Sequence, residues 1–140
     1  MQFFIAASLL AATASAASPV FNVSKFAASC APHSSLCDYS FGVVQASAGE
    51  STPVDCSAQV VSDGSLPAVT DGTCKDSSRT WTITKNDDGG FTLTVSQAVT
   101  PSTNLKGTFV APASDISKED TGASSQEKYI GSTDFGLASA

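Results

Sequence analysis

The chain has 140 residues, a formal net charge of −6 and a pI of about 4.4. The chain has 7 Lys and Arg but 13 Asp and Glu, so its electrostatic potential does not attract phosphate groups. This argues against nucleic acid and anionic membranes as partners. Charged residues make up 14% of the chain and hydrophobic residues 41%, so it falls outside the disordered class. We expect one small folded domain.

The first seventeen residues, MQFFIAASLLAATASAA, have the pattern of a secretory signal peptide. A short apolar stretch precedes small residues, and Ala14-Ser15-Ala16 fits the cleavage rule of signal peptidase. The apolar stretch is shorter than the ~20 residues that span a bilayer. We therefore predict a signal peptide at 1–17 and a secreted domain at 18–140, without a membrane span. Secretion would expose the sequon Asn22-Val23-Ser24 to glycosylation, which makes Asn22 a candidate site.

Apolar and polar residues alternate with a period of two in several segments of the remaining chain, which predicts β-strands. In chain order the expected strands are 21–26, 38–46, 54–61, 80–84, 91–96 and 105–111, with a weaker one at 129–132. Turn residues at 86–90 separate TWTIT from FTLTVS and predict a β-hairpin there. No window carries the apolar stripe of an amphipathic helix. The pattern predicts an all-β fold, a small antiparallel β-barrel or a sandwich.

Large apolar side chains that share one parity of these strands are expected to form the core, because alternate residues face the same side of a sheet. They are Tyr39, Phe41, Val43, Trp81, Ile83, Phe91, Leu93, Val95 and Phe109. The faces of Tyr39, Phe41 and Trp81 could instead line a ligand cavity. A hollow interior of roughly 300 Å³ or more would favour a small-ligand carrier, and a filled core would argue against it.

The four cysteines at positions 30, 37, 56 and 74 predict a disulfide framework, because an even number in a small secreted domain ordinarily pairs. Three connectivities are possible. Closure of short loops favours Cys30–Cys37 with Cys56–Cys74, although the sequence leaves the choice open. The paired C-x₂₋₄-C spacing of zinc sites is missing, so we expect no metal.

The segment 112–126, PASDISKEDTGASSQ, is polar and lacks aromatic residues, which predicts a long surface loop. Surface loops often carry recognition, and we take Asp115, Lys118, Glu119 and Asp120 as the candidate recognition residues. Their carboxylates could also bind calcium, but the D-x-[DN]-x-[DN]-G order of a calcium loop is missing.

Residues for catalysis are few. His33 is the single histidine, and a Ser-His-Asp arrangement would need a serine and an aspartate from elsewhere to converge on its small loop. The pairs Asp87-Asp88 and Glu119-Asp120 have the residue type that glycosidases use, but adjacent residues in a turn point apart. We expect no catalytic residue, no enzymatic activity and no cofactor.

The stretch 21–58 resembles a known family in two motifs, HSSLC-x-YSF from His33 to Phe41 and TPV-x-CSA from Thr52 to Ala58. Cys74 and the strand of Trp81 follow at a similar spacing. The family is a fungal secreted one that contains the major Alternaria allergen and hypersensitive-response-inducing protein elicitors. The resemblance covers about two thirds of the expected mature chain.

The resemblance implies a β-barrel, a Cys56–Cys74 bridge, secretion into the plant apoplast and no established enzymatic activity. It also implies recognition by a plant extracellular defence protein or cell-surface receptor, which triggers defence and hypersensitive cell death. The allergen's additional C-terminal cysteines have no counterpart here, so we expect a monomer or a non-covalent dimer. The alternatives are an allergen-like barrel that carries a flavonoid-like ligand and, third, an extracellular hydrolase.

Overall fold

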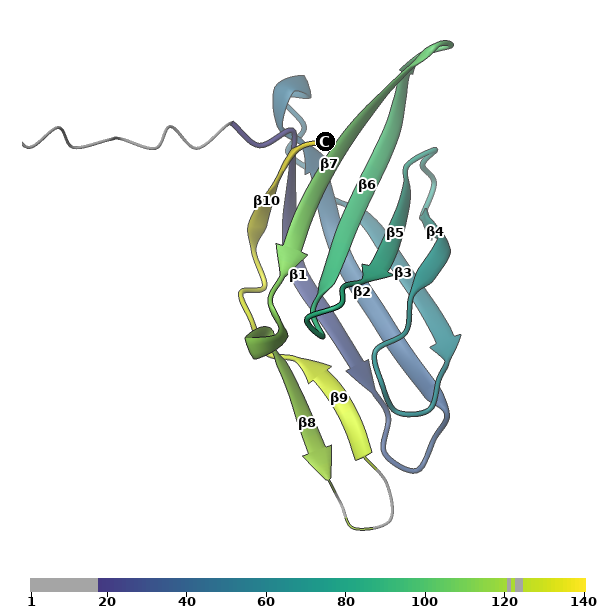
Figure 1. The fold of residues 1–140 in the computed structure, drawn as a ribbon. Helices are drawn as coiled ribbons and strands as arrows, with labels where there is room; N and C mark the ends of the chain where they lie inside the picture. Colours follow the sequence, from purple (N-terminus) through teal and green to yellow (C-terminus); the bar gives the residue numbers. More distant parts are fainter. Residues whose placement is uncertain (1–17, 121, 123–124) are drawn as a thin grey trace, which may run out of the picture.

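The computed structural model describes residues 18–120, 122 and 125–140, so the predicted signal peptide at 1–17 lies outside the described residues. The described chain is an all-β structure (Figure 1). Its strands are β1 (Phe21–Cys30), β2 (Leu36–Gln45), β3 (Val54–Val61), β4 (Val69–Cys74), β5 (Thr80–Lys85), β6 (Phe91–Thr100), β7 (Thr103–Ala111), β8 (Ile116–Asp120), β9 (Ser125–Tyr129) and β10 (Phe135–Ser139). Two 3-10 turns, η1 (Ala46–Ala48) and η2 (Ala113–Asp115), are its helical elements.

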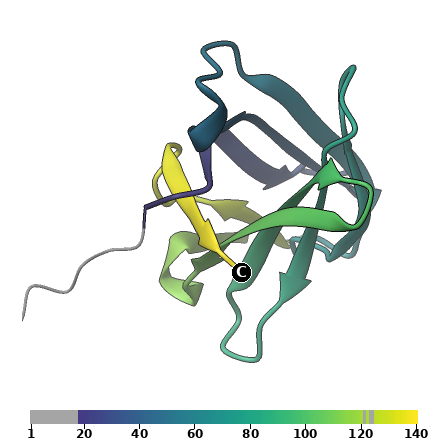
Figure 2. The same ribbon diagram turned by 90° about the horizontal axis from the view of Figure 1, so that it is seen from above.

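Eight of the strands close an antiparallel barrel, which decides between the two predicted all-β architectures. Strands β1 to β7 follow one another around the ring, and β10 closes it by pairing with both β7 and β1. Figure 2, seen from above, shows this ring. The β8–β9 hairpin lies beside the ring and joins it through one registered pair, Ser29 with Lys128.

Three strands were not predicted, and the expected surface loop at 112–126 is wrong. This segment contains η2, β8 and the start of β9. Five registered pairs join β8 to β9, but the side chains of β8 are half-buried or exposed, so the strand carries no alternation for sequence reasoning to detect. The weak strand expected at 129–132 is misplaced, because β9 ends at Tyr129.

Strand β4 was missed because its sequence, VTDGTC, reads as a turn around Asp71 and Gly72. The structure uses the glycine for packing. A Cβ at position 72 would lie 2.4 Å from the Trp81 ring, so only glycine lets the indole lie against this backbone. Strand β10 is short and was missed because it forms by pairing with β1 and β7, not through a pattern in its own sequence.

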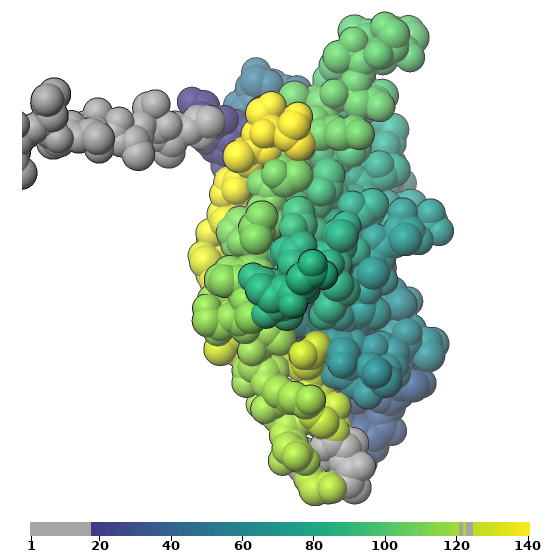
Figure 3. Space-filling model, in the orientation of Figure 1, coloured from purple at the N-terminus to yellow at the C-terminus, as the bar shows by residue number. Residues whose placement is uncertain are grey.

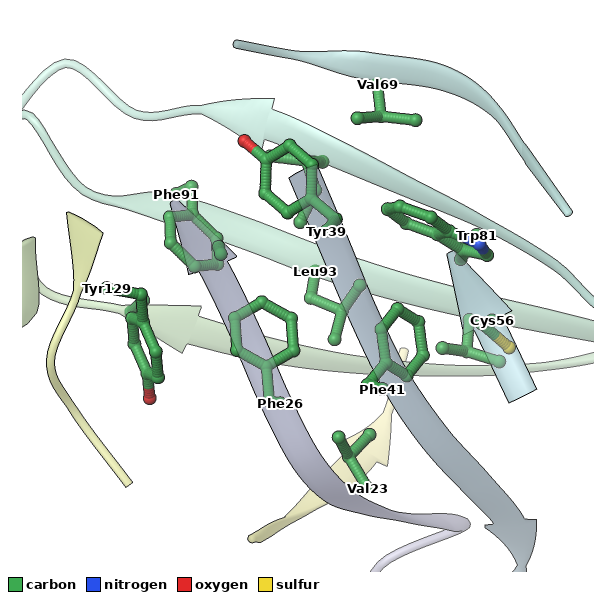
Figure 4. Packing of buried hydrophobic residues seen from close by; sticks show 14 of the residues in the cluster. Val23, Phe26, Tyr39, Phe41, Cys56, Val69, Trp81, Phe91, Leu93 and Tyr129 are labelled. Carbon is green, nitrogen blue, oxygen red and sulfur yellow. The ribbon is translucent and has the colours of Figure 1, made fainter. Parts of the chain in front are cut away.

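The barrel interior is filled by aromatic and aliphatic side chains (Figure 4). The predicted core is confirmed for Tyr39, Phe41, Val43, Trp81, Ile83, Phe91, Leu93 and Val95, each at most 3% exposed. Tyr39 and Phe41 pack edge-on against Trp81, with ring centroids 5.9 and 5.1 Å away. Phe109 is half-buried rather than core, because it stacks on Phe135, at a centroid distance of 3.8 Å, beside the buried cluster.

Both predicted disulfides are present. Cys30–Cys37 joins the adjoining ends of β1 and β2, and Cys56–Cys74 joins β3 to β4. In each case the two cysteines are cross-strand partners, so the bridges follow the register of the sheet. Within the described residues no helix has the length and apolar character to cross a membrane.

Candidate functional site

Three chain segments meet at the end of the barrel that carries the β8–β9 hairpin (Figure 1). Residues 33–35 after β1, residues 62–64 after β3, and Ser125 and Gln126 of β9 line a hollow of about 310 Å³. At its lining the Ser125 hydroxyl is buried without a hydrogen-bond partner in the described part of the chain. We call this hollow together with the β8–β9 hairpin the hairpin end.

The base of the hairpin is fixed to the barrel by Tyr129. Its ring packs edge-on against Phe26 at 5.0 Å and tilted against Phe91 at 5.8 Å. The Tyr129 hydroxyl donates to the carbonyl of Ser132 at 2.8 Å. Burial, and then the negative charge of Asp115, raise the pKa of Tyr129. The hairpin is thus anchored in the hydrophobic core at one end.

The opposite side of the hairpin contacts the connection between β3 and β4. The Glu127 N–H donates to the Gly64 carbonyl at 2.8 Å, and its carboxylate accepts from the Leu66 N–H at 2.8 Å. Lys85 lies 3.9 Å from the same carboxylate. These contacts hold the inner part of β9 against the body of the barrel.

The structure brings the four candidate recognition residues onto this hairpin but separates them into two groups. Asp115 lies at the base, where its carbonyl accepts from the Ile130 N–H at 2.7 Å. Lys118, Glu119 and Asp120 are exposed on the outer half of β8. Successive side chains of a strand point to opposite faces, so Lys118 and Asp120 share one face and Glu119 lies on the other.

His33 is exposed beside the hollow, with a left-handed backbone at φ 58°. Asp63, also at the hollow, accepts hydrogen bonds from the Ser65 N–H and the Ser62 hydroxyl, and the bonds from Ser65 and Ser62 lower the pKa of Asp63. Among the described residues the imidazole has no hydrogen-bonded serine or carboxylate. His33 and Asp63 thus add one imidazole and one carboxylate to the lining of the hollow.

The other predicted positions are neither in the lining of the hollow nor on the β8–β9 hairpin. Asp87 and Asp88 are in the β5–β6 turn, where the Asp88 carboxylate accepts from the Gly90 N–H at 2.8 Å, so Asp88 stabilises the turn. Asn22 is exposed on β1, and its glycosylation stays a prediction. Over residues 18–120, 122 and 125–140, no group of three or more His, Cys, Asp or Glu side chains is placed to hold a metal ion.

Sequence reasoning missed Arg79, the single arginine, which is 4% exposed near the start of β5. Its guanidinium donates to the Val43 carbonyl, to Gln97 and to Glu50, and lies 5.7 Å from the Phe21 ring centroid. Hydrogen bonds from Arg79 and from the Gln45 N–H lower the pKa of Glu50. The serines beside Arg79 give it the appearance of an exposed turn residue, so no local signal indicates its burial.

Comparisons with protein-family models, with curated proteins and with solved structures give no match to this chain. The family resemblance of 21–58 therefore stays a prediction. The function has to be argued from the fold and from the chemistry of its surface.

Proposed function

We propose that this protein is a secreted fungal elicitor that acts by binding a plant extracellular defence protein or cell-surface receptor through the hairpin end. Binding would then trigger defence responses and hypersensitive cell death. The observation that carries the proposal is the hairpin end itself, where exposed Lys118, Glu119 and Asp120 stand on a strand pair anchored by Tyr129. A rigid base beneath exposed charges reduces the ordering cost of association.

The filled interior favours this reading over a carrier of a flavonoid-like ligand inside the barrel. The rings that would line such a cavity pack together, because Tyr39 and Phe41 both contact Trp81. A drug-sized ligand needs a pocket of roughly 300 Å³ or more, so it would have to displace these buried rings. The two disulfides are compatible with an extracellular protein.

The test is infiltration of purified, oxidised protein into leaves, with heat-denatured and reduced protein as controls. The triple variant Lys118→Ala, Glu119→Ala and Asp120→Ala is expected to lose most of the cell death while keeping the barrel fold. The matched control, Lys106→Ala with Asp55→Ala and Asp87→Ala, removes one cation and two anions from exposed positions elsewhere and is expected to keep it. Equal activity of the two triple variants would contradict recognition through the hairpin end.

A catalytic mechanism is tested separately with His33→Ala. An enzyme that depended on this imidazole would lose activity by orders of magnitude, whereas a binder is expected to change little. Loss of cell death in a folded His33→Ala protein, with the hairpin triple variant fully active, would replace the binding proposal by a catalytic one.

A further inference from the structure

The barrel wall is incompletely paired between β3 and β4. These strands share two registered pairs, Cys56 with Cys74 and Ser57 with Thr73, whereas β2 and β3 share eight, as far as Leu36 with Val61. Beyond Ser57 the strands separate around a groove of about 260 Å³. Its lining is formed by 58–60 of β3, Ala68 before β4, and 69–71 of β4. We call the groove and the β3 edge as far as Val61 the β3–β4 seam.

Packing elsewhere keeps the seam open. Strand β4 changes register against β5 between Val69 and Gly72, where the Trp81 ring lies on the glycine. Before β4, Leu66 is fully buried, and the Tyr39 hydroxyl donates to the Pro67 carbonyl at 2.6 Å. These anchors direct the start of β4 toward the barrel end, and irregularities of this kind commonly terminate pairing.

Two hydrogen bonds fix the direction of the backbone groups along β3. The Ser62 N–H donates to Ser35, next to β2, and the Asp55 carbonyl accepts from Lys75, next to β4, both at 2.7 Å. Backbone direction alternates along a strand, so odd-numbered positions of β3 face away from β2. The N–H and carbonyl groups of Gln59 and Val61 therefore face the seam, where the register gives them no β4 partner.

We propose that the β3–β4 seam binds an extended segment of a partner protein, which pairs with the edge at Gln59 and Val61 as an added strand. Unpaired N–H and carbonyl groups at a sheet edge are complementary to a strand and to few other ligands. This surface shares no lining residue with the hairpin end, although Val61 directly precedes Ser62 of the hollow. The inference does not depend on elicitor activity.

The lining specifies the segment. Side chains that face the barrel would meet Ala58, Val60 and Val69, so small or β-branched apolar residues fit there. Side chains of the partner that face outward would lie near Asp71, the one charged residue of the lining. They would also lie near Asp38, whose carboxylate accepts from the side-chain amide of Gln59 at 3.0 Å. The partner segment therefore alternates apolar residues with lysine or arginine.

A second copy of this chain is a poorer occupant. Pairing of two β3 edges would bring two Asp71 carboxylates and two chains of net charge −6 together. Like charges oppose such an association. A basic strand from another protein has the complementary charge.

Amide hydrogen exchange of the oxidised protein tests the open edge first. The amides of Ala58 and Val60, which face β2, are expected to exchange at least tenfold more slowly than those of Gln59 and Val61. Saturation with the probe peptide Ac-Lys-Val-Lys-Val-Lys-NH2 is expected to slow Gln59 and Val61 at least tenfold. Slow exchange of all four amides without peptide, or no added protection with it, would overturn the proposal.

Peptide specificity is measured by isothermal titration with two controls. Ac-Lys-Lys-Val-Val-Lys-NH2 has the same composition without the alternation, and Ac-Glu-Val-Glu-Val-Glu-NH2 reverses the charge. Both are expected to bind at least tenfold more weakly than the probe peptide. Equal binding of the scrambled basic peptide would indicate attraction of charge alone and overturn strand addition.

The matched variants are Gln59→Pro and Gln59→Ala. Proline removes the N–H that faces the seam and leaves the β2 ladder intact, whereas alanine keeps that N–H and removes only the side chain. Gln59→Pro is expected to weaken peptide binding at least tenfold, and Gln59→Ala less than threefold. If Gln59→Pro does not fold, Asp71→Lys supplies the test by repelling the peptide.

Wild-type affinity in folded Gln59→Pro, or in Asp71→Lys where proline prevents folding, would overturn the proposal. A dimer in sedimentation that Gln59→Pro dissociates would also overturn it, because the occupant would then be a second copy. Leaf cell death is measured in parallel. Peptide binding therefore tests the seam proposal, and cell death tests the elicitor proposal, in separate assays.

Discussion

Two parts of the barrel wall are held together in different ways. On the side of β5, β6 and β7, six registered pairs join the first two strands and nine join the last two, without a covalent cross-link. Strands β3 and β4, which border the seam, share two pairs and one disulfide. Side chains hold the connections around these two strands: Arg79 with Glu50 links the connections before β3 and before β5, and Tyr39 with Pro67 lies near the start of β4.

The difference shows where stability is distributed and where it is concentrated. In a long ladder the stabilisation is distributed over many backbone hydrogen bonds. We therefore expect its strands to separate only when the hydrophobic core beneath them is disrupted. The short pairing of β3 with β4 depends on a few side chains, so single substitutions there are expected to disrupt it locally. The long β6–β7 hairpin also projects beyond the body of the molecule (Figure 3), and its outer residues 98–104 are exposed.

The largest effect is expected from Leu93→Ala on the ladder side. Leu93 is fully buried, and its truncation leaves a cavity in the core, so the free energy of unfolding should fall by about 2–5 kcal/mol. Urea unfolding measures this. The control Val61→Ala, at a side chain 70% exposed, is expected to stay within ~0.5 kcal/mol of wild type. Similar losses in both variants would contradict the assigned core.

Removal of Cys56–Cys74 by alanine at both positions is expected to cost about 3 kcal/mol, because this bridge closes a loop of sequence separation 18. Removal of Cys30–Cys37, with separation 7, should cost about 2 kcal/mol. Hydrogen exchange at Ser57 and Thr73 should accelerate in the first variant only. Equal acceleration in both would show that the pairing of β3 with β4 does not depend on its own bridge.

Tyr39→Phe removes the hydrogen bond to Pro67 and should cost about 1 kcal/mol. Burial, and then the charge of Glu127, raise the pKa of Tyr39 above its ordinary value of 10.0. The neutral phenol therefore contributes stability that is present below pH 10.0 and is lost as the pH rises above it. Urea unfolding between pH 8 and 11 should show a shallower alkaline loss in Tyr39→Phe, and an unchanged slope would refute this assignment.

The smallest effect is expected from the acid dependence of Glu50. Hydrogen bonds from Arg79 and Gln45 lower the pKa of Glu50 below its ordinary value of 4.5. The stabilisation from this carboxylate is therefore present above pH 4.5 and is lost as the pH falls through the folded pKa. Glu50→Gln should flatten the stability profile below pH 5 by less than ~1 kcal/mol, because the carboxylate is partly exposed. Parallel profiles of variant and wild type would exclude this contribution.

The sequence by itself determined the elements whose signal is local. Alternation in TWTIT and FTLTVS predicted the β5–β6 hairpin and placed Trp81, Ile83, Leu93 and Val95 in the core, because residues two apart face the same side. The cysteine count and the short spacings favoured the two disulfides that the register of the sheet then realises. The cluster of exposed charges near 118–120 was also readable, although its backbone was not.

Tertiary structure decided what depends on partners far away in the chain. The Asp71-Gly72 step becomes part of a strand because the indole of Trp81 needs the space over the glycine. Strand β8 forms because β9, anchored by Tyr129, presents it with an edge. Arg79 is buried because Val43, Gln97 and Glu50 converge on it from three other segments. Closure of the ring by β10 and the open β3–β4 seam have the same origin, since pairing between strands depends on which edges meet in space and not on the pattern within either strand.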